Sequence, residues 1–453
     1  MSASPARLAA RDVVTRVREG SAYAHEVLSA TLRRLKLSAD DAAFATRLAY
    51  GALQTAGTLD DAIDRYLDGK RIEPRVRDAL RISTYELLYL SSEPRAAVHQ
   101  GVELVRGVRK QAAGLANAVL RRLADDAPSF PWGDAATDDD ALARLNGHPA
   151  WLASMWVTEL GRETAAAVMA ADNEPAPLFL AMNPFAGSVE DARAAIRADG
   201  ALPRPCAIPG CVVVSDAGAA VRGRALADGL VVATDAAAQL VARLVGARRD
   251  MTIVEVGAGR GTKTLLMQGY ALETGGPAHI YAVDVHAFKS RLLTERLARF
   301  GVPDVVALTG DATEFSSIEG APEPGTVDAI LVDAPCSGLG TLRRHPEKRW
   351  RVERPDLDSL ADLGARLLSA AADLVRPGGF VVYSTCTLAE VENAQVISAF
   401  LQSEQGKSFS IDSLASDVPE EWHRFITAEG YFRSVPEPGG PDGHFAVRLV
   451  RNQ

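Results

Sequence analysis

The sequence is poor in cysteine and has no long apolar run. It holds four cysteines in 453 residues, too few for a disulfide framework, so we expect a reducing compartment, by default the cytoplasm. No uninterrupted stretch of about 18 apolar residues is present, which argues against a membrane span. The first residues meet charges at once, without the apolar core of a secretion signal. We therefore expect a cytoplasmic protein that does not associate with membranes.

A strong charge of one sign is also missing. The chain carries a formal net charge of -9. Residues 1–130 hold 20 Lys and Arg against 16 Asp and Glu, a formal +4, so the remainder carries -13. Because a local basic patch makes the contacts to phosphates, the acidic total does not exclude a nucleic-acid partner.

The length predicts two or three domains. Apolar residues at helical spacing predict a helical bundle over residues 1–125, and the Pro, Gly and Asp of 126–142 are typical of a solvated linker. Helical spacing followed by short β-like runs predicts a small connecting α/β subdomain over 143–245. Over 246–453 apolar strands alternate with helical segments, which predicts a mostly parallel, doubly wound sheet with helices on both faces.

Four strand ends in 246–453 carry residues that suit a nucleotide-like ligand. Ligands of such sheets bind at the carboxyl ends of the strands. Asp284 is placed to bind two ribose hydroxyls, Asp311 to meet an adenine edge, and Asp333 ends a further strand. The first strand end is a loop whose glycines allow a tight turn and close approach of a ligand to the backbone: Gly257, Ala258, Gly259, Arg260, Gly261, Thr262 and Lys263.

Two other interpretations of these strand ends exist. Each acidic residue can cap a helix, and dinucleotide dehydrogenases have a similar glycine loop. A dehydrogenase, however, would give no reason for cysteines at the later strand ends. S-adenosylmethionine fits the four ends together better, and we expect it as the cofactor.

Two of the cysteines follow apolar strands and stand among small polar residues. Cys336 lies in Asp-Ala-Pro-Cys-Ser, and Cys386 lies in Tyr-Ser-Thr-Cys-Thr. A free cysteine is usually an inert part of the core, and we expect this of Cys206 and Cys211, which lack that setting. Two isolated cysteines also fall short of a zinc site, so no metal is expected.

Two thiols at a cofactor site suit methylation of cytosine at C5. A thiolate added to C6 makes C5 nucleophilic toward a methyl donor, which is covalent catalysis. The charge that develops on the ring needs a hydrogen-bond donor, which Asp333 would be if protonated in a dry pocket. A cation such as Lys263 would lower the pKa of the attacking thiol. A second group must then help H5 and the thiol to leave.

These residues resemble the RNA cytosine-5 methyltransferases of the RsmB/NOP family, especially the bacterial RsmB (Fmu/Sun) type that modifies 16S ribosomal RNA. The matching motifs are residues 332–337, 343–350 and 383–388, with Glu392 and Asn393 downstream. The resemblance implies that Cys386 is the nucleophile and that Cys336 assists product release. Cytosine-5 DNA methyltransferases use the Pro-Cys thiol instead, so the Thr-Cys motif indicates RNA.

The resemblance covers nearly the whole chain. It implies a NusB-like, all-α RNA-binding domain at the N-terminus, through Ala9–Val14 and Leu115–Arg122, and a Rossmann-like class I methyltransferase domain that ends with Asp442–Leu449. One departure lies in the cofactor loop, which usually reads Cys-Ala-Ala-Pro-Gly-Gly-Lys-Thr in the family. Here Lys263 keeps its place but Arg260 replaces the proline.

We expect the RNA contacts of the catalytic domain in a basic run that follows the Cys336 loop and contains Trp350 for stacking. A basic run is more often a solvated face, but its position favours RNA. Its members are Arg343, Arg344, His345, Lys348 and Arg349.

The expected partner is 16S rRNA, methylated at the cytosine that the family numbers 967, by a monomer. Another rRNA site or tRNA is the nearest alternative. A non-catalytic RNA-binding or ribosome-assembly factor is the alternative of another class, and the retention of both thiols argues against it.

Overall fold

The chain forms two compact units. The computed structural model describes residues 3–20, 24–90 and 92–453. The helical unit consists of Met1–Pro175 together with Leu342–Glu353, and the sheet unit consists of Ala176–Thr341 and Arg354–Gln453. The chain thus leaves the sheet unit after Thr341 and returns to it at Arg354. Among the described residues, no helix is long and apolar enough to cross a membrane.

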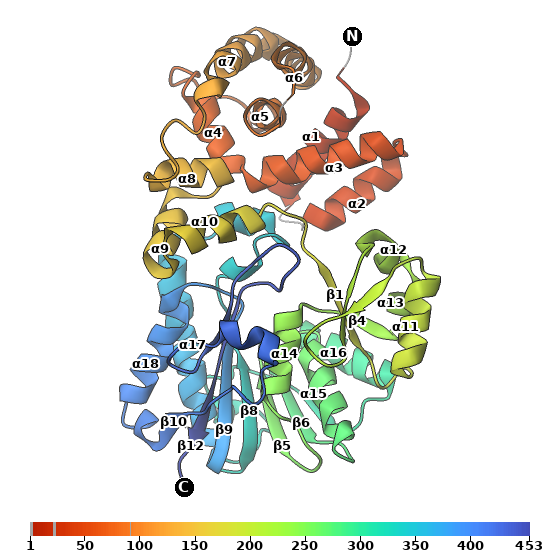
Figure 1. Ribbon diagram of the computed structural model, residues 1–453, viewed down its shortest axis with the longest axis vertical. Coiled ribbons are helices and arrows are strands. Elements are labelled where there is room, and N and C mark those ends of the chain that lie inside the picture. Colours follow the sequence, from red (N-terminus) through yellow and green to blue (C-terminus); the bar gives the residue numbers. More distant parts are fainter. Residues whose placement is uncertain (1–2, 21–23, 91) are drawn as a thin grey trace. The chain divides into compact units, whose positions relative to one another are not determined.

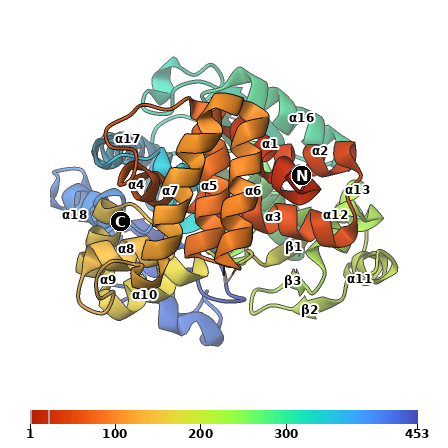
Figure 2. The same cartoon turned by 90° about the horizontal axis from the view of Figure 1, so that it is seen from above.

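The helical unit confirms the predicted N-terminal bundle. The helical repeat of Ala10, Val13, Val14 and Val17 is buried in its core, with at most 2% of each residue exposed. Helices α5, α6 and α7 lie side by side (Figures 1 and 2). The helices of the unit are α1 (Pro5–Gly20), α2 (Ala24–Leu35), α3 (Ala39–Gln54), α4 (Ala56–Asp64), α5 (Pro74–Leu88), α6 (Pro94–Val108), α7 (Ala113–Asp126), α8 (Asp139–Asn146), α9 (Ala150–Leu160) and α10 (Arg162–Ala171).

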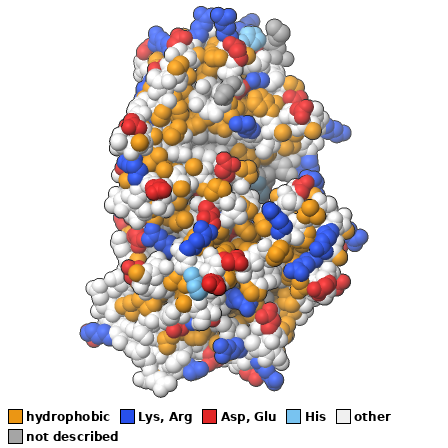
Figure 3. Space-filling view, in the orientation of Figure 1, with side chains coloured by type: hydrophobic (Ala, Val, Ile, Leu, Met, Phe, Trp, Pro, Cys, Tyr) orange, Lys and Arg blue, Asp and Glu red, His pale blue; other side chains and the backbone are white. Residues whose placement is uncertain are grey.

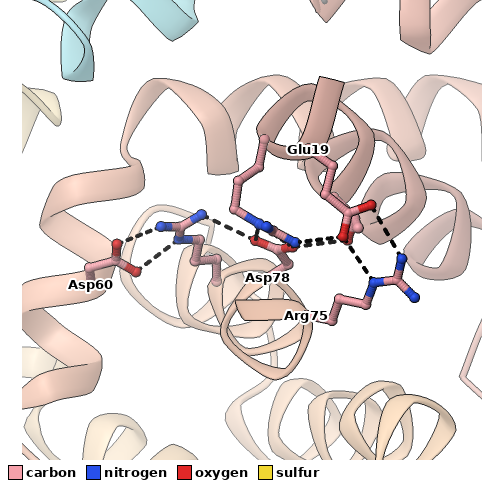
Figure 4. Close-up of polar contacts among 7 residues, drawn as sticks. Glu19, Asp60, Arg75 and Asp78 are labelled. Carbon is pink, nitrogen blue, oxygen red and sulfur yellow. Dashed lines mark hydrogen bonds and ion pairs between the residues drawn. The ribbon is translucent and has the colours of Figure 1, made fainter. Parts of the chain in front are cut away.

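A buried carboxylate joins the helices of this unit. Asp78, on α5, is fully buried and accepts hydrogen bonds from Arg18 on α1 at 3.0 Å and from Arg81 at 3.2 Å. Figure 4 shows the network continuing from Arg81 to Asp60 on α4 and from Arg18 to Glu19. A buried charge is stable only when it is paired and hydrogen-bonded. Arg18 and Arg81 therefore stabilise the packing of these helices through Asp78.

The stretch expected to be a solvated linker, residues 126–142, packs against the bundle. The ring of Phe130 lies 5.1 Å from that of Tyr89, and the guanidinium of Arg65 lies 4.0 Å from the centre of the Trp132 ring. Helices α8 to α10 follow directly. The compact helical unit consequently extends to Pro175.

The sheet unit begins with a small α/β subdomain. Its antiparallel sheet has the order β2-β3-β1-β4. Leu180, Ile196 and Val212 contribute to its core. Its elements are β1 (Leu178–Met182), α11 (Val189–Ala198), β2 (Pro203–Pro205), β3 (Cys211–Val214), α12 (Ala217–Arg222), α13 (Arg224–Ala227) and β4 (Val231–Ala233).

The larger sheet has the order β10-β12-β9-β8-β5-β6-β7, with β11 paired to β12. The five strands from β7 to β9 in this order are parallel, and β12 is antiparallel to β9 and β10. The strands are β5 (Thr252–Val256), β6 (His279–Asp284), β7 (Val305–Thr309), β8 (Val327–Asp333), β9 (Val375–Thr385), β10 (Phe409–Ile411), β11 (Phe432–Ser434) and β12 (His444–Arg451).

Both faces of this sheet are buried. Ile253 and Ala329 belong to one apolar cluster, whereas their neighbours Val254 and Ile330 belong to another. Since successive side chains of a strand point to opposite faces, each cluster covers one face, which confirms the doubly wound fold. The helices of the sheet are α14 (Ala236–Leu244), α15 (Thr262–Glu273), α16 (Ala287–Phe300), α17 (Arg354–Leu374) and α18 (Ala394–Gln402).

The strand order reverses between β5 and β8, which makes their carboxyl ends the topological switch point. Val256 of β5 pairs with Val332 of β8 there. Gly257 follows with a φ of +80°, and a Cβ on it would lie 2.5 Å from the carbonyl oxygen of Asp333. Only glycine fits this close approach of two strand ends.

Candidate active site

The loop between β5 and α15 is folded onto the end of β6. The amides of Gly257 and Ala258 both donate to the carbonyl of Val283 at 3.0 Å. The amide of Gly259 donates to Oδ2 of Asp284 at 3.1 Å. The structure therefore brings the expected cofactor loop and Asp284 together. Asp284 is 6% exposed, and part of its carboxylate already holds the loop, so its bond to a ribose stays a prediction.

The remaining members of the expected cofactor set lie around this loop. Arg296, on α16, donates to the carbonyl of Arg260 at 3.1 Å and to Oγ1 of Thr262 at 2.8 Å. Asp311 is exposed after β7, and its Oδ1 accepts from the amide of Thr313 at 2.9 Å, which lowers the pKa of Asp311. The contact of Asp311 with an adenine stays a prediction.

Cys336 and Cys386 lie in contact at the ends of neighbouring strands. Their Sγ atoms are 3.4 Å apart, and the amide of Cys386 donates to Sγ of Cys336 at 3.3 Å. This closeness follows from the parallel pairing of β8 with β9, in which Asp333 is opposite Ser384. The hydrogen bond to Cys386 and burial raise the pKa of Cys336 well above its ordinary value. Cys336 therefore keeps its proton at neutral pH.

Lys263 and Asp333 form an ion pair beside the thiols. Nζ of Lys263 lies 2.6 Å from Oδ2 of Asp333, and Ser384 donates to Oδ1 of Asp333 at 3.2 Å. Burial alone would lower the pKa of Lys263, but the charge of Asp333 and the hydrogen bond to it outweigh burial and raise the pKa. Asp333 is thus in contact with the ammonium of Lys263, and its donation of a hydrogen bond to a base stays a prediction. The donor next to the thiols is Lys263.

Buried polar contacts hold the two thiol loops together. Glu392 accepts from the amide of Ser337 at 2.8 Å and from its hydroxyl at 2.5 Å. Asn393 donates to the carbonyl of Thr387 at 3.0 Å and accepts from Thr385 at 2.6 Å. Glu392 and Asn393 are the Glu-Asn pair downstream of the Thr-Cys motif. Their hydrogen bonds hold the loops that carry Cys336 and Cys386.

One pair of residues escaped the sequence analysis. Glu255, at the penultimate position of β5, is 1% exposed and accepts a hydrogen bond from the hydroxyl of Thr264 on α15. Burial raises the pKa of Glu255 to about 8. The signal in the sequence was an acidic residue between two valines of a buried strand.

The expected RNA contact of Arg349 is wrong. Arg349 is fully buried inside the helical unit and donates to the carbonyls of Gln54 at 3.1 Å and Gly147 at 2.9 Å and to Oδ1 of Asn173 at 2.9 Å. Burial lowers the pKa of Arg349 to about 10. Its guanidinium serves the packing of the segment η5 (Pro346–Trp350) and is shielded from a nucleic acid.

The neighbours of Arg349 in the basic run differ in how far they are buried. Trp350 donates from Nε1 to Gln54 at 2.8 Å, and a Cβ on Gly57 would lie 2.1 Å from its ring, so this ring packs tightly within the unit. Arg343 is 5% exposed. Arg344, His345 and Lys348 are half-buried, and their RNA contacts stay a prediction. On the face drawn in Figure 3, Lys and Arg side chains lie among Asp and Glu.

The other two cysteines are neighbours as well. The amide of Cys206 donates to the carbonyl of Cys211 at 3.3 Å, at the end of the β2–β3 hairpin. Cys211 is 3% exposed within an apolar cluster, where Nε2 of Gln239 donates to its Sγ at 3.3 Å. In the described ranges, no group of three or more His, Cys, Asp and Glu side chains is arranged to hold a metal ion.

Family models match three parts of the chain. The model of the 16S rRNA methyltransferases RsmB/F matches residues 242–450, that of the NusB family matches 4–125, and that of the RsmF/B-like ferredoxin-like domain matches 148–221. The last match falls on the small α/β subdomain and the helices before it.

Individual proteins are similar over most of the chain. A probable ribosomal RNA small subunit methyltransferase B of Bacillus subtilis is 30% identical over 456 residues, with 99% of each chain covered. A putative methyltransferase of Mycobacterium tuberculosis is 35% identical over 415 residues, which cover 86% of this chain and 85% of that protein.

Solved structures share the fold. The protein PH0851 superposes with a TM-score of 0.79 at 21% identity over 100% of both chains. A methyltransferase homologue from Pyrococcus horikoshii gives 0.57 at 21% identity, with 69% of this chain and 98% of that one covered. The family match confirms the predicted fold class and the cofactor, S-adenosylmethionine. The chain belongs to the RsmB/F family of 16S rRNA methyltransferases.

Proposed function

We propose that this protein transfers a methyl group from S-adenosylmethionine to C5 of one cytosine in 16S rRNA, through a covalent bond between Cys386 and C6 of the base. The observation that carries the proposal is the pair of thiols 3.4 Å apart, next to the Lys263–Asp333 ion pair at the switch point of the sheet. Methylation of C5 requires a nucleophile such as a thiol, and a second thiol and a cation beside it at a cofactor edge suit the later steps.

The loop after β5 fits the cofactor. A Cβ on Gly259 would meet nothing closer than the carbonyl of Gly257 at 3.8 Å, so space beside the loop is open. The loop of residues 257–262, whose glycines let a ligand approach the backbone closely, and the carboxylates of Asp284 and Asp311 would hold S-adenosylmethionine there. When bound, the cofactor supplies an electrophilic methyl group.

The side chains of this chain perform the remaining steps. Cys386, as thiolate, adds to C6, and the ammonium of Lys263 meets the negative charge that develops on the ring. Asp333 keeps that ammonium in place. C5 then takes the methyl group and later loses H5 as a proton to solvent. The electron pair of the C5–H bond restores the C5–C6 double bond, and Cys386 leaves as a thiolate.

Cys336 is suited to this last step. Because its pKa is raised, it is a protonated thiol in contact with Cys386. Its S–H can donate a hydrogen bond to the departing thiolate of Cys386, which lowers the barrier to breaking the Cys386–C6 bond. We therefore infer that Cys336 assists product release.

The names of relatives support the choice of target. Proteins of Bacillus subtilis and Escherichia coli that resemble this chain are described as ribosomal RNA small subunit methyltransferase B, and the N-terminal match to the NusB family is consistent with an RNA substrate. We propose the cytosine that the family numbers 967 as the target.

Bisulfite sequencing of rRNA and tRNA tests the proposal, because it locates 5-methylcytosine directly. A strain that lacks the gene should lose the mark at one cytosine of 16S rRNA. Wild-type protein should restore it, and Cys386→Ala should not. Loss of the mark in tRNA or at another rRNA site would move the target. No change at any cytosine would indicate a non-catalytic role in RNA binding or ribosome assembly.

A further inference from the structure

Glu255 is a buried acid beneath the cofactor loop. It stands between Val254 and Val256 in β5 and is 1% exposed. Thr264, the third residue of α15, is fully buried and donates its hydroxyl hydrogen to the Glu255 carboxyl. The bond thus joins the strand that enters the cofactor loop to the helix that leaves it.

The charged groups that face Glu255 come from three elements. Lys263 lies on α15, Asp333 on β8 and Asp284 at the end of β6. Lys263 is paired with Asp333 at 2.6 Å, and none of the described Lys, Arg or His nitrogens forms an ion pair with Glu255. Burial raises the pKa of Glu255 to about 8, Thr264 and Lys263 oppose this shift, and Asp333 and Asp284 add to it.

Consecutive residues of α15 are therefore fastened to different strands. Lys263 is held on β8 through Asp333, and Thr264 is held on β5 through Glu255. The helix begins at Thr262, directly after the loop that is expected to bind the cofactor. Movement of this first turn would displace both the loop and the ammonium of Lys263.

We propose that Glu255 is a positioning residue for S-adenosylmethionine, which acts as an uncharged acid and locks the first turn of α15 through Thr264. The inference rests on the cofactor loop and is independent of which RNA base is methylated. An ionised Glu255 would place a third carboxylate beside Asp333 and Asp284 and compete for Lys263. Burial beside these two carboxylates, rather than the bond from Thr264, therefore keeps the proton on Glu255.

Replacement by glutamine separates the charge from the hydrogen bond. Glu255→Gln keeps the shape and a hydrogen-bonding group, so S-adenosylmethionine should bind within about twofold of wild type in isothermal titration calorimetry at pH 7. Glu255→Ala leaves the buried hydroxyl of Thr264 without its partner and should bind about tenfold more weakly. Glu273→Gln, an exposed change at the far end of α15, is the matched control and should bind like wild type.

Thermal unfolding between pH 6 and pH 9 gives a second measurement. The folded-state pKa of Glu255 lies above its unfolded value, so the folded protein holds a proton that it must release as the pH rises toward about 8. Stability of the wild type should thus fall relative to Glu255→Gln as the pH increases. The proposal is overturned if Glu255→Gln binds the cofactor as weakly as Glu255→Ala, or if the difference in melting temperature does not change with pH.

Discussion

The sheet unit contains two pairs of neighbouring cysteines, and only their surroundings distinguish them. Cys336 and Cys386 follow parallel strands at the switch point, beside the ammonium of Lys263. Cys206 and Cys211 close an antiparallel hairpin, and Cys211 lies in an apolar core. Proximity of two thiols therefore does not by itself identify a catalytic pair. The edge of the sheet and the nearby cation are the features for which we propose the first pair as the reaction site.

The pKa values of the thiols do not distinguish the two pairs of cysteines. A hydrogen bond between the partners raises the pKa of Cys336 in the first pair and that of Cys211 in the second. In the second pair the same bond lowers the pKa of Cys206 to about 7. A thiol with a lowered pKa thus also occurs outside the proposed site, away from the loop of residues 257–262 and from the Lys263–Asp333 ion pair. The following substitutions test whether position, rather than thiol reactivity, decides function.

Removing the proposed nucleophile should have the largest effect. Cys386→Ala should reduce methylation of 16S rRNA by at least about a thousandfold, because covalent activation of C5 is lost. Affinity for S-adenosylmethionine should persist. The matched control, Cys206→Ala, should methylate at the wild-type rate in the same tritium-transfer assay. Activity that survives in Cys386→Ala and disappears in Cys206→Ala would contradict the proposal and assign catalysis to the pair of Cys206 and Cys211.

Removing the partner thiol should trap the reaction after methyl transfer. In Cys336→Ala the departing thiolate loses its hydrogen-bond donor, so multiple turnover should fall by about a hundredfold. A covalent protein–RNA band should then accumulate on a denaturing gel. The double variant Cys336→Ala/Cys386→Ala should lose that band. Absence of the band in Cys336→Ala, together with an active Cys386→Ala, would reverse the two roles.

Removing the cation should lower the rate of methylation although both thiols are retained. Lys263→Met leaves Asp333 unpaired and Cys386 without a positive neighbour, so the rate should fall by about a hundredfold. Half-maximal activity should also require a higher pH, because a thiolate without a nearby cation forms less readily. Lys70→Met, in the helical unit, serves as control. An unchanged pH profile for Lys263→Met would remove Lys263 from the activation of the thiol.

The sequence predicted that Cys336 and Cys386 share the ligand-binding edge because both follow strands of one parallel sheet, and such strand ends meet at one edge. Arg349 shows where this reasoning stops. Its partners Gln54, Gly147 and Asn173 are far away along the chain, and no local pattern encodes such contacts. The apolar side chain of Trp350 within the same run was the available sign that the segment is packed rather than free.

In the glycine loop, too, the sequence predicts some features and the folded structure alone decides others. Its position between β5 and α15 followed from the alternation of strand and helix, and Gly257 is required there by its φ of +80°. The contact between Lys263 and Asp333 did not follow from the sequence, because the length and direction of the Lys263 side chain decide whether the ammonium reaches the carboxylate. Lys263 lies 70 positions earlier, and its contact with β8 exists only once the sheet has formed.

The smallest effect on methylation is expected in the second pair, where Cys206 has a lowered pKa but no proposed part in the reaction. Alkylation of Cys206 by iodoacetamide, followed by mass spectrometry, should reach half of its maximal rate near pH 7, since the Cys211 thiol hydrogen-bonds to the Cys206 thiolate. In Cys211→Ala that donor is missing, so the midpoint should move up toward about 8.5, the value of a free cysteine. Methylation should be unchanged by the alkylation of Cys206, which is half-buried at the end of a hairpin. Loss of activity in step with its modification would show that a thiol away from the switch point also serves the reaction, and the contrast between the two pairs would fail.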